Sequence, residues 1–374
     1  MAETFVVDQK SLLAILSSMQ PICSKRTTLD ATASILFNCG PRELVLKSTD
    51  LEISFQASNT LSSSTLTENK SFLVNGKRVF DIVKELDGDI TFMLENNQLM
   101  LTSNGVKLAL NIKDAQEFPP FPERIENLMQ LEAPFLSALL EKVSFLIPQN
   151  NANPALNGLY LEITPTCLSM TTTDGHCLAQ VKTALYNLEK AQSWLLPRRA
   201  VVELKKILDG TTEQSVFLGT CGNQLVFSGE TFNFFTKVLA TPFPEYKAVL
   251  ERDAVVPAYI DRTSLVKTLR RSSCLLSGQF IATTFGFKPN SVEVAMHNKE
   301  VGKLEETLTI QDFAGNPLDI RFYAPYLLSG LSAFSDSMVK FYLNNATRPI
   351  IFETEEGTKY TLTYLVMPVS PTGA

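Results

Sequence analysis

Hydrophobic and polar positions alternate along the chain in two ways, and each predicts a different element. Apolar residues spaced by three and four predict an amphipathic helix over Lys10–Gln20. Alternating runs at Glu43–Lys47 and Leu51–Phe55 predict antiparallel strands. A second helix is expected over Lys77–Leu86, and Asp87-Gly88 is expected to end it.

The same order of elements is predicted again further along the chain. In the first block, the turn Asn96-Asn97 separates apolar runs at Phe92–Leu94 and Leu99–Leu101, which predicts a hairpin. The second block begins with a strand at Trp194–Leu196, followed by a helix that reaches Leu208 and is closed by Asp209-Gly210. Two further strands follow, at Val216–Leu218 and at Leu225–Phe227.

Landmark residues show that this pattern occurs three times. An apolar–acidic pair followed by two leucines occurs at Val7-Asp8, Leu131-Glu132 and Ile260-Asp261, at intervals of 124 and 129 residues. A large apolar residue is followed by proline at Phe118-Pro119, Phe243-Pro244 and Met367-Pro368. Thr49-Asp50 recurs as Thr173-Asp174, and Asn298 falls 124 residues later, where the third copy lacks the Thr-Asp pair. A second helical pattern also recurs, and its third copy spans Phe322–Phe334.

We therefore predict an α+β fold of three tandem domains, each with two helices and about eight antiparallel strands. The expected domains are residues 1–125, 126–252 and 253–374, with proline-containing linkers between them. Three unrelated domains of similar length would not explain why the landmark residues recur at nearly the same spacing and in the same order. A repeated domain without a catalytic constellation points to a function in shape or surface.

The candidate chemistry is sparse. The six cysteines are scattered without a C-x2-C spacing, and only His176 and His297 are present. These counts predict no metal site, no cofactor and no catalytic residues, and they favour reduced thiols in a cytoplasmic protein. No apolar stretch is long enough for a transmembrane helix, and the first residues lack the pattern of a secretory signal, so no membrane association is expected.

Charge is distributed unevenly. The chain carries a net charge of −6, whereas the six predicted helical segments together carry +7 and leave −13 on the rest. Helices with this balance could present a basic face to a polyanion. Ordinary solvated helix faces would explain the same charges. We find no aromatic ladder for stacking bases, so any nucleic-acid contact is expected to be with phosphates and independent of sequence.

Several short segments give the chain a specific resemblance. The strongest is Thr173-Asp174-Gly175-His176-Cys177-Leu178-Ala179, supported by Leu156-Asn157-Gly158, Leu196–Arg199, Phe243–Tyr246 and Tyr364–Pro368. In order and spacing these resemble the bacterial DNA polymerase sliding clamp, the β processivity subunit, from Phe5 to Val369.

The resemblance implies that two three-domain subunits close into a ring around duplex DNA, with helices lining the hole. It also implies a homodimer that tethers the catalytic subunit of the replicative DNA polymerase, the clamp loader, and other polymerases and repair proteins. The protein would be a non-catalytic subunit of a nucleotidyltransferase, without 3′–5′ exonuclease activity, in the cytoplasm and at the nucleoid during replication. A closed ring holds DNA by topology, so it needs no tight contact.

The resemblance also implies a pocket for short peptides between the second and third domains. Its positions here are Leu156, Thr173, Gly175, His176, Cys177, Leu178, Pro244, Val249, Thr347, Pro349, Leu365, Val366, Met367, Pro368 and Val369. Most are apolar or small, as suits a pocket for a leucine or phenylalanine anchor. We interpret His176 as pocket wall, although a structural histidine is the alternative.

Three positions depart from the family pattern. Cys177, Ala248 and Asn153 stand where basic residues are common, so we expect the pocket rim to have lost positive charge. The chain also ends in the small polar segment Ser370–Ala374, which could partly cover the pocket.

The family's DNA-contacting positions correspond to Arg26, Lys84, Asn150, Arg198 and Arg199, and helix placement adds Lys205, Lys206 and Arg271, with Lys77 and Lys267 as further candidates. At the subunit interface, Leu108 and Leu110 are expected to meet Leu275 and Leu276 at the end of the first helix of domain three. These leucines could instead belong to the core of their own domains.

Two other functions remain open at this point. A tripled interaction scaffold that never acts on DNA would have the same repeats but no topological retention on DNA. An enzyme on a tripled fold is disfavoured by the two histidines and by the absence of metal-ligand spacing or a nucleophile motif.

Overall fold

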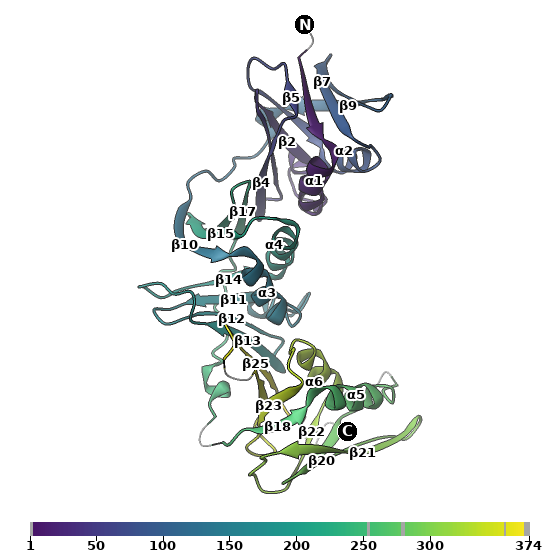
Figure 1. The fold of residues 1–374 in the computed structure, drawn as a ribbon, viewed down its shortest axis with the longest axis vertical. Helices are drawn as coiled ribbons and strands as arrows, with labels where there is room; N and C mark the ends of the chain where they lie inside the picture. The colour runs from purple at the N-terminus through teal and green to yellow at the C-terminus, as the bar shows by residue number, and fades with distance from the viewer. Residues whose placement is uncertain (1–2, 253–254, 278–280, 355–356, 370–374) are drawn as a thin grey trace. The chain divides into compact units, whose positions relative to one another are not determined.

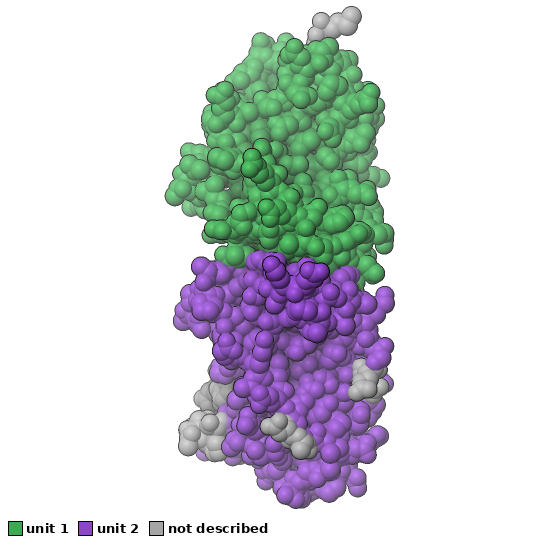
Figure 2. Space-filling view, turned by 90° about the vertical axis from the view of Figure 1, so that its left-hand side faces the viewer, with its two compact units in different colours: residues 1–137, 202–238 green, residues 138–201, 239–374 purple. Residues whose placement is uncertain are grey.

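The computed structural model describes residues 3–252, 255–277, 281–354 and 357–369. The chain divides into two compact units, residues 1–137 with 202–238 and residues 138–201 with 239–374 (Figure 2). Each unit contains one continuous antiparallel sheet, of 13 strands in the first and 12 in the second, as far as the structure describes them. The second repeat contributes strands to both sheets.

Each repeat has two α-helices among the described residues (Figure 1). They are α1 (Gln9–Cys23) and α2 (Gly76–Lys84), α3 (Ala133–Ser144) and α4 (Arg198–Gly210), and α5 (Arg262–Ser273) and α6 (Ala324–Leu331). Helix α1 packs against α2 and strands β1–β4, and α5 packs against α6. Large apolar residues of the helices and of the facing strands, such as Leu12, Phe37 and Phe341, are buried and form the core.

The first repeat contains nine described strands, and the other two contain eight each. In the first they are β1 (Thr4–Asp8), β2 (Ser34–Cys39), β3 (Glu43–Thr49), β4 (Ile53–Thr60), β5 (Ser63–Ser64), β6 (Lys70–Asn75), β7 (Asp89–Glu95), β8 (Gln98–Ser103) and β9 (Val106–Asp114). In the second they are β10 (Glu126–Glu132), β11 (Gly158–Ile163), β12 (Leu168–Thr173), β13 (Cys177–Thr183), β14 (Gln192–Pro197), β15 (Ser215–Cys221), β16 (Gln224–Ser228) and β17 (Phe232–Lys237). In the third they are β18 (Ala258–Asp261), β19 (Thr283–Lys288), β20 (Ser291–Asn298), β21 (Gly302–Gln311), β22 (Leu318–Phe322), β23 (Met338–Tyr342), β24 (Ile350–Glu353) and β25 (Thr361–Val366).

The α+β class, the three copies and the two helices per copy are confirmed, but several boundaries were wrong. The first helix continues three residues beyond Gln20, and the second stops at Lys84 rather than Leu86. In the second repeat α4 continues two residues beyond Leu208 and ends at Gly210, so Asp209-Gly210 does mark its end. Leu51 does not begin a strand, because its φ of 74° places it in a turn, and the third helical pattern is helical only over Ala324–Leu331.

In the first and third repeats the acidic residue of the helix landmark is an N-cap. Asp8 accepts the backbone N–H of Ser11 at 2.9 Å, and Asp261 accepts that of Ser264 at 2.7 Å. Both carboxyl groups therefore have a lowered pKa, since the hydrogen bonds favour the charged form. The landmark repeats because each first helix needs an acceptor for its unpaired N–H groups.

The Thr-Asp landmark is a turn that is built in the same way in the first two repeats. Asp50 Oδ1 accepts the N–H groups of Glu52 and Ile53, at 2.9 and 2.8 Å. Asp174 Oδ1 accepts those of His176 and Cys177, at 2.8 and 2.7 Å. The turn leads directly into β4 in the first repeat and into β13 in the second.

The junctions between repeats reuse the same pair of strands. The last strand of the second repeat, β17, pairs with β4, and the last strand of the third, β25, pairs with β13. Each junction therefore joins the last strand of one repeat to the strand that follows the Asp turn of the repeat before it.

Gly330 breaks the repeat pattern for a steric reason. A Cβ atom there would lie 1.9 Å from Cε1 of Tyr364, because the buried Tyr364 ring occupies the space beside α6. The Tyr364 hydroxyl donates to the Tyr326 carbonyl at 2.7 Å. The ring thus fixes α6 onto β25.

Gly330→Ala is expected to destabilise the protein by about 1–3 kcal/mol, the usual cost of overpacking a core. Gly210→Ala is the matched control, since its Cβ would meet no atom within 4 Å. Urea unfolding followed by circular dichroism should show a lowered midpoint for Gly330→Ala and no lowering for Gly210→Ala. Equal midpoints for the two variants would contradict the assignment.

Candidate functional site

A row of side chains crosses five neighbouring strands, β23, β24, β25, β13 and β12, on one face of the second sheet. Strand register pairs Tyr342 with Ile351, Ile351 with Leu365, Leu365 with Leu178, and Leu178 with Thr173. Directly paired residues lie on the same face of a sheet, so these five form a continuous band. Ile351, Leu365 and Leu178 are buried. We call Tyr342, Ile351, Leu365, Leu178 and Thr173 the apolar row.

The segment between the second and third repeats packs onto this row. Phe243, Tyr246, Val249 and Leu250 contact it, together with Tyr160 and Met367. The rings of Tyr160 and Phe243 stack with centroids 5.0 Å apart. The row and this cover therefore make one apolar cluster with a partly exposed margin.

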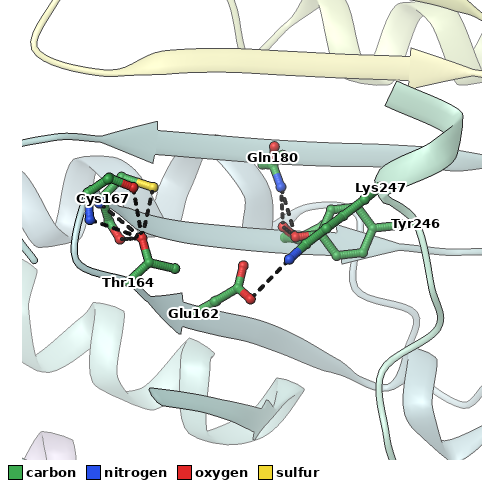
Figure 3. A network of polar contacts seen from close by, with 8 residues as sticks. Glu162, Thr164, Cys167, Gln180, Tyr246 and Lys247 are labelled. Carbon is green, nitrogen blue, oxygen red and sulfur yellow. Dashed lines mark hydrogen bonds and ion pairs between the residues drawn. The ribbon is translucent and has the colours of Figure 1, made fainter. Parts of the chain in front are cut away.

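Polar contacts hold the covering segment in place (Figure 3). The Tyr246 hydroxyl lies 3.1 Å from Nε2 of Gln180, which donates to it, and 3.3 Å from Oγ1 of Thr171. Next to it, Lys247 donates to Glu162 at 3.3 Å, and this bond raises the pKa of Lys247. The buried amide and hydroxyl groups fix the position of Tyr246, because leaving them unpaired would be costly.

A pocket opens at the margin of the cluster. It is lined by Val249, Tyr342, Pro349 and Ile351, with Arg252 and Arg348 among its polar residues.

Arg252 is held in place at this margin. Its guanidinium lies 4.5 Å from the Tyr342 ring centroid and pairs with Glu353. Burial tends to raise the pKa of Glu353, but Arg252 and Lys340 outweigh burial and lower it. Glu353 is therefore a charged group that anchors Arg252 beside the pocket.

The structure brings most of the expected pocket residues together. Leu178, Val249, Leu365 and Met367 belong to the apolar cluster, Thr173 to the apolar row, and Pro349 to the pocket. The Gly175-His176 turn adjoins them, because the Met367 N–H donates to the His176 carbonyl at 2.9 Å.

The remaining expected residues lie around this centre. A Cβ at Gly175 would lie 3.9 Å from Leu156, and the His176 ring stacks on Tyr326 at 5.5 Å. Pro244 and Pro368 are half-buried next to Phe243 and Met367 in sequence. Thr347 is exposed in a turn capped by Asn345, and the Val369 N–H donates to the Arg321 carbonyl at 2.8 Å.

Two expected pocket residues face the wrong way. Cys177 and Val366 pair across β13 and β25, one residue out of step with Leu178 and Leu365. Because side chains alternate along a strand, both point to the opposite face, where they are 1% and 0% exposed. Burial also raises the pKa of the Cys177 thiol to about 12, so it is neither a rim charge nor a nucleophile.

Sequence reasoning missed six members of the cluster: Tyr160, Phe243, Tyr246, Leu250, Tyr342 and Ile351. Phe243 and Tyr246 belong to a segment that was used only as a landmark. The expected rim positions Asn153 and Ala248 are exposed. The expected covering segment Ser370–Ala374 lies outside the described residues.

The expected DNA-contacting residues fall into two groups. Arg26, Lys84 and Asn150 are exposed, and their side chains make no ion pair or hydrogen bond within the described parts of the chain, as is also true of Lys77 and Lys267. The others are engaged. Arg198 donates to the Ile147 carbonyl at 3.0 Å, Lys205 pairs with Asp209 at 2.7 Å, Lys206 pairs with Glu203 at 3.2 Å, Arg271 pairs with Glu306, and Arg199 is half-buried.

The expected interface leucines are half-buried. Leu108 and Leu110 lie on β9. Leu275 and Leu276 lie in the turn after α5 rather than within the helix, which ends at Ser273.

No group of three metal-binding side chains occurs within the part of the chain that the structure describes. None of its described helices is long and apolar enough to cross a membrane.

The three repeats, their shared sheet junctions and the apolar cluster define a protein with a three-domain clamp fold. Comparison with known families agrees. The N-terminal, central and C-terminal domains of the DNA polymerase III beta subunit match residues 3–122, 130–245 and 247–370. The chain belongs to the DNA polymerase III beta subunit family.

Individual relatives are similar over their whole length. The beta sliding clamp of Haemophilus influenzae is 26% identical over 368 residues, which cover 98% of this chain and 99% of the relative. A crystal structure of the DNA polymerase III subunit beta from Pseudomonas aeruginosa has a TM-score of 0.89 at 24% identity and covers 98% of this chain and 99% of that chain. A sliding clamp of the same organism bound to griselimycin also has a TM-score of 0.89, at 23% identity, and covers 99% and 100% of the two chains.

Proposed function

We propose that two copies of this chain close into a ring that encircles duplex DNA without sequence specificity. The ring tethers the replicative polymerase, the clamp loader and other replication and repair proteins through the apolar cluster. The observation that carries this proposal is the pair of junctions between repeats. Each joins the last strand of one repeat to the strand after the Asp turn of the preceding repeat.

Two strands are left over by this rule. The last strand of the first repeat is β9, and the strand after the Asn298 turn of the third repeat is β21. Residues 106–111 of β9 pair only with β8, and residues 302–309 of β21 pair only with β20, within the described chain. Free edges of this kind favour strand addition, so β9 of one subunit and β21 of the other would form the third type of junction.

The existing junctions also supply a register. Phe234, the counterpart of Leu108, pairs with Phe55, and Asn233 pairs with Gln56. Transferred to the free edges, this register sets Leu108 opposite Leu304 of the partner subunit and Lys107 opposite Glu305 of the partner subunit. In this register two leucines face each other across the two strands, and a lysine faces a glutamate.

The junction inside the second unit supports the contact between leucines. Tyr364 is the counterpart of Leu108, and its ring lies 6.0 Å from that of Phe145, just after α3. Leu275 and Leu276 follow Cys274, the residue directly after α5 that corresponds to Phe145. We therefore place Leu108 and Leu110 against Leu275 and Leu276 of the partner subunit.

For DNA we propose phosphate contacts by Arg26, Lys84, Asn150, Arg198 and Arg199, with Lys205, Lys206 and Arg271 as weaker contributors. The last three already pair with carboxylates, which lowers the charge they offer to phosphate. Weak, exposed contacts suit a ring that slides.

For partner peptides we propose the apolar cluster with its neighbouring turn and pocket. The site comprises Leu156, Thr173, Gly175, His176, Leu178, Pro244, Val249, Thr347, Pro349, Leu365, Met367, Pro368 and Val369. The buried row offers a floor for a leucine or phenylalanine anchor, and Met367 provides an adaptable wall.

The exposed Ala248 and Asn153 leave this part of the rim without basic side chains. A peptide whose free carboxylate falls at this part of the rim is expected to bind roughly two- to fivefold more weakly than its amide, because Ala248 and Asn153 supply no cation there to offset the cost of desolvating the carboxylate. Fluorescence anisotropy with the two peptides measures the ratio. Ala248→Arg should remove the difference, and equal binding of both peptides to the unmodified protein would contradict the prediction.

The proposed domains are residues 1–125, 126–252 and 253–374; residue 253, at the second boundary, lies outside the described chain. A location in the cytoplasm and at the nucleoid follows from the proposed role. Primer extension on a long primed circle tests that role: the chain with a clamp loader and ATP should lengthen the products of the replicative polymerase. Unchanged product length would contradict it.

A further inference from the structure

Asn298 stands where the first two repeats carry aspartate, and it performs the same turn function. Its Oδ1 accepts the N–H groups of Glu300 and Val301, at 2.9 and 3.3 Å. The third repeat has therefore kept the acceptor although it lost the Thr-Asp pair.

The other end of the side chain explains the change to an amide. Asn298 Nδ2 donates to the Leu275 carbonyl at 2.6 Å and to Oγ of Ser277 at 3.0 Å. In the first repeat the corresponding oxygen of Asp50 lies 3.8 Å from the Lys25 ammonium, which is a donor. A carboxylate suits a lysine, but it would face the Leu275 carbonyl with no proton to donate.

Asn298 is 4% exposed and joins two elements of the proposed subunit interface. One is the turn that carries Leu275 and Leu276, and the other is the β20–β21 hairpin, whose second strand has the free edge. A buried amide that satisfies backbone groups on both elements holds them in one geometry.

We propose that Asn298 is a positioning residue for ring closure: it fixes the Leu275-Leu276 turn relative to the free edge of β21 so that both meet the partner subunit together. This inference rests on the proposed ring.

Asn298→Asp tests the inference, because it keeps the turn acceptor, removes the bond donated to the Leu275 carbonyl and sets a carboxylate against that carbonyl. The dimer dissociation constant, measured by sedimentation at serial dilutions, is expected to rise roughly ten- to hundredfold, the usual effect of leaving a buried acceptor unpaired. Asp174→Asn, the reverse exchange in the second repeat, also keeps its acceptor and should leave dimerisation unchanged.

A double-mutant cycle separates positioning from general destabilisation. If Asn298 acts through the leucine turn, Asn298→Asp should add little to the loss of dimer caused by Leu275→Ala with Leu276→Ala. Additive losses, or an unchanged dissociation constant for Asn298→Asp in a protein that dimerises, would overturn the inference. A monomeric unmodified protein would refute the proposed ring itself. Retained peptide binding by Asn298→Asp and by the Leu275→Ala, Leu276→Ala variant shows that the unit remains folded.

Discussion

Leu108→Glu is expected to convert the dimer into monomers at micromolar concentration. The substitution places a carboxylate on the free edge of β9, where we expect Leu304, Leu275 and Leu276 of the partner subunit. An unpaired charge buried at an interface costs several kcal/mol, which corresponds to at least about a thousandfold in the dissociation constant. Analytical ultracentrifugation measures the change.

Leu185→Glu is the matched control for this result. Leu185 is 53% exposed in the second unit and lies outside the proposed interface, so the same chemical change there should leave the dimer intact. A Leu108→Glu dimer of unchanged strength would refute the interface. Its leucines would then belong to the core of their own domains.

Met367→Asp is expected to reduce the affinity for an anchor-bearing peptide by at least about thirtyfold. Met367 packs against the apolar cluster while remaining partly exposed, so the substitution should remove an anchor contact without unfolding the sheet. Fluorescence anisotropy with a labelled peptide that ends in a leucine–phenylalanine anchor measures this loss.

Met129→Asp controls for the chemistry of the change, since Met129 is half-buried on β10 and belongs to the first unit. Met129→Asp should bind the peptide normally. Met367→Asp should have the same dimer stability and the same thermal unfolding as the unmodified protein. Undiminished binding by Met367→Asp would show that peptides bind elsewhere.

Periodicity and landmarks were enough to predict the three repeats and their two helices, because each landmark has a local physical cause. Asp8 and Asp261 cap helices, and Asp50 and Asp174 close turns through hydrogen bonds to the next few residues. Boundaries were less predictable. The second helix of the first repeat stops at Lys84, two residues before the expected end, and Leu51 adopts a positive φ where the pattern favoured a strand.

The site was predicted only in part, because much of it depends on pairing between distant strands. Tyr342 and Ile351 join the apolar row through register across β23, β24 and β25, which no local pattern reveals. The same register turns Cys177 away from the site although its neighbours in sequence belong there. The resemblance pointed to this segment but carried no information on which face of the sheet each residue occupies.

The central claim is that the protein holds DNA by topology. The most direct test is to load it onto nicked circular DNA with a clamp loader and ATP, and then to compare retention on the circle with retention after linearisation. A sliding ring remains on the circle and leaves through the ends of the linear molecule. Equal retention on both forms, or on neither, would contradict the account and favour an interaction scaffold that does not encircle DNA.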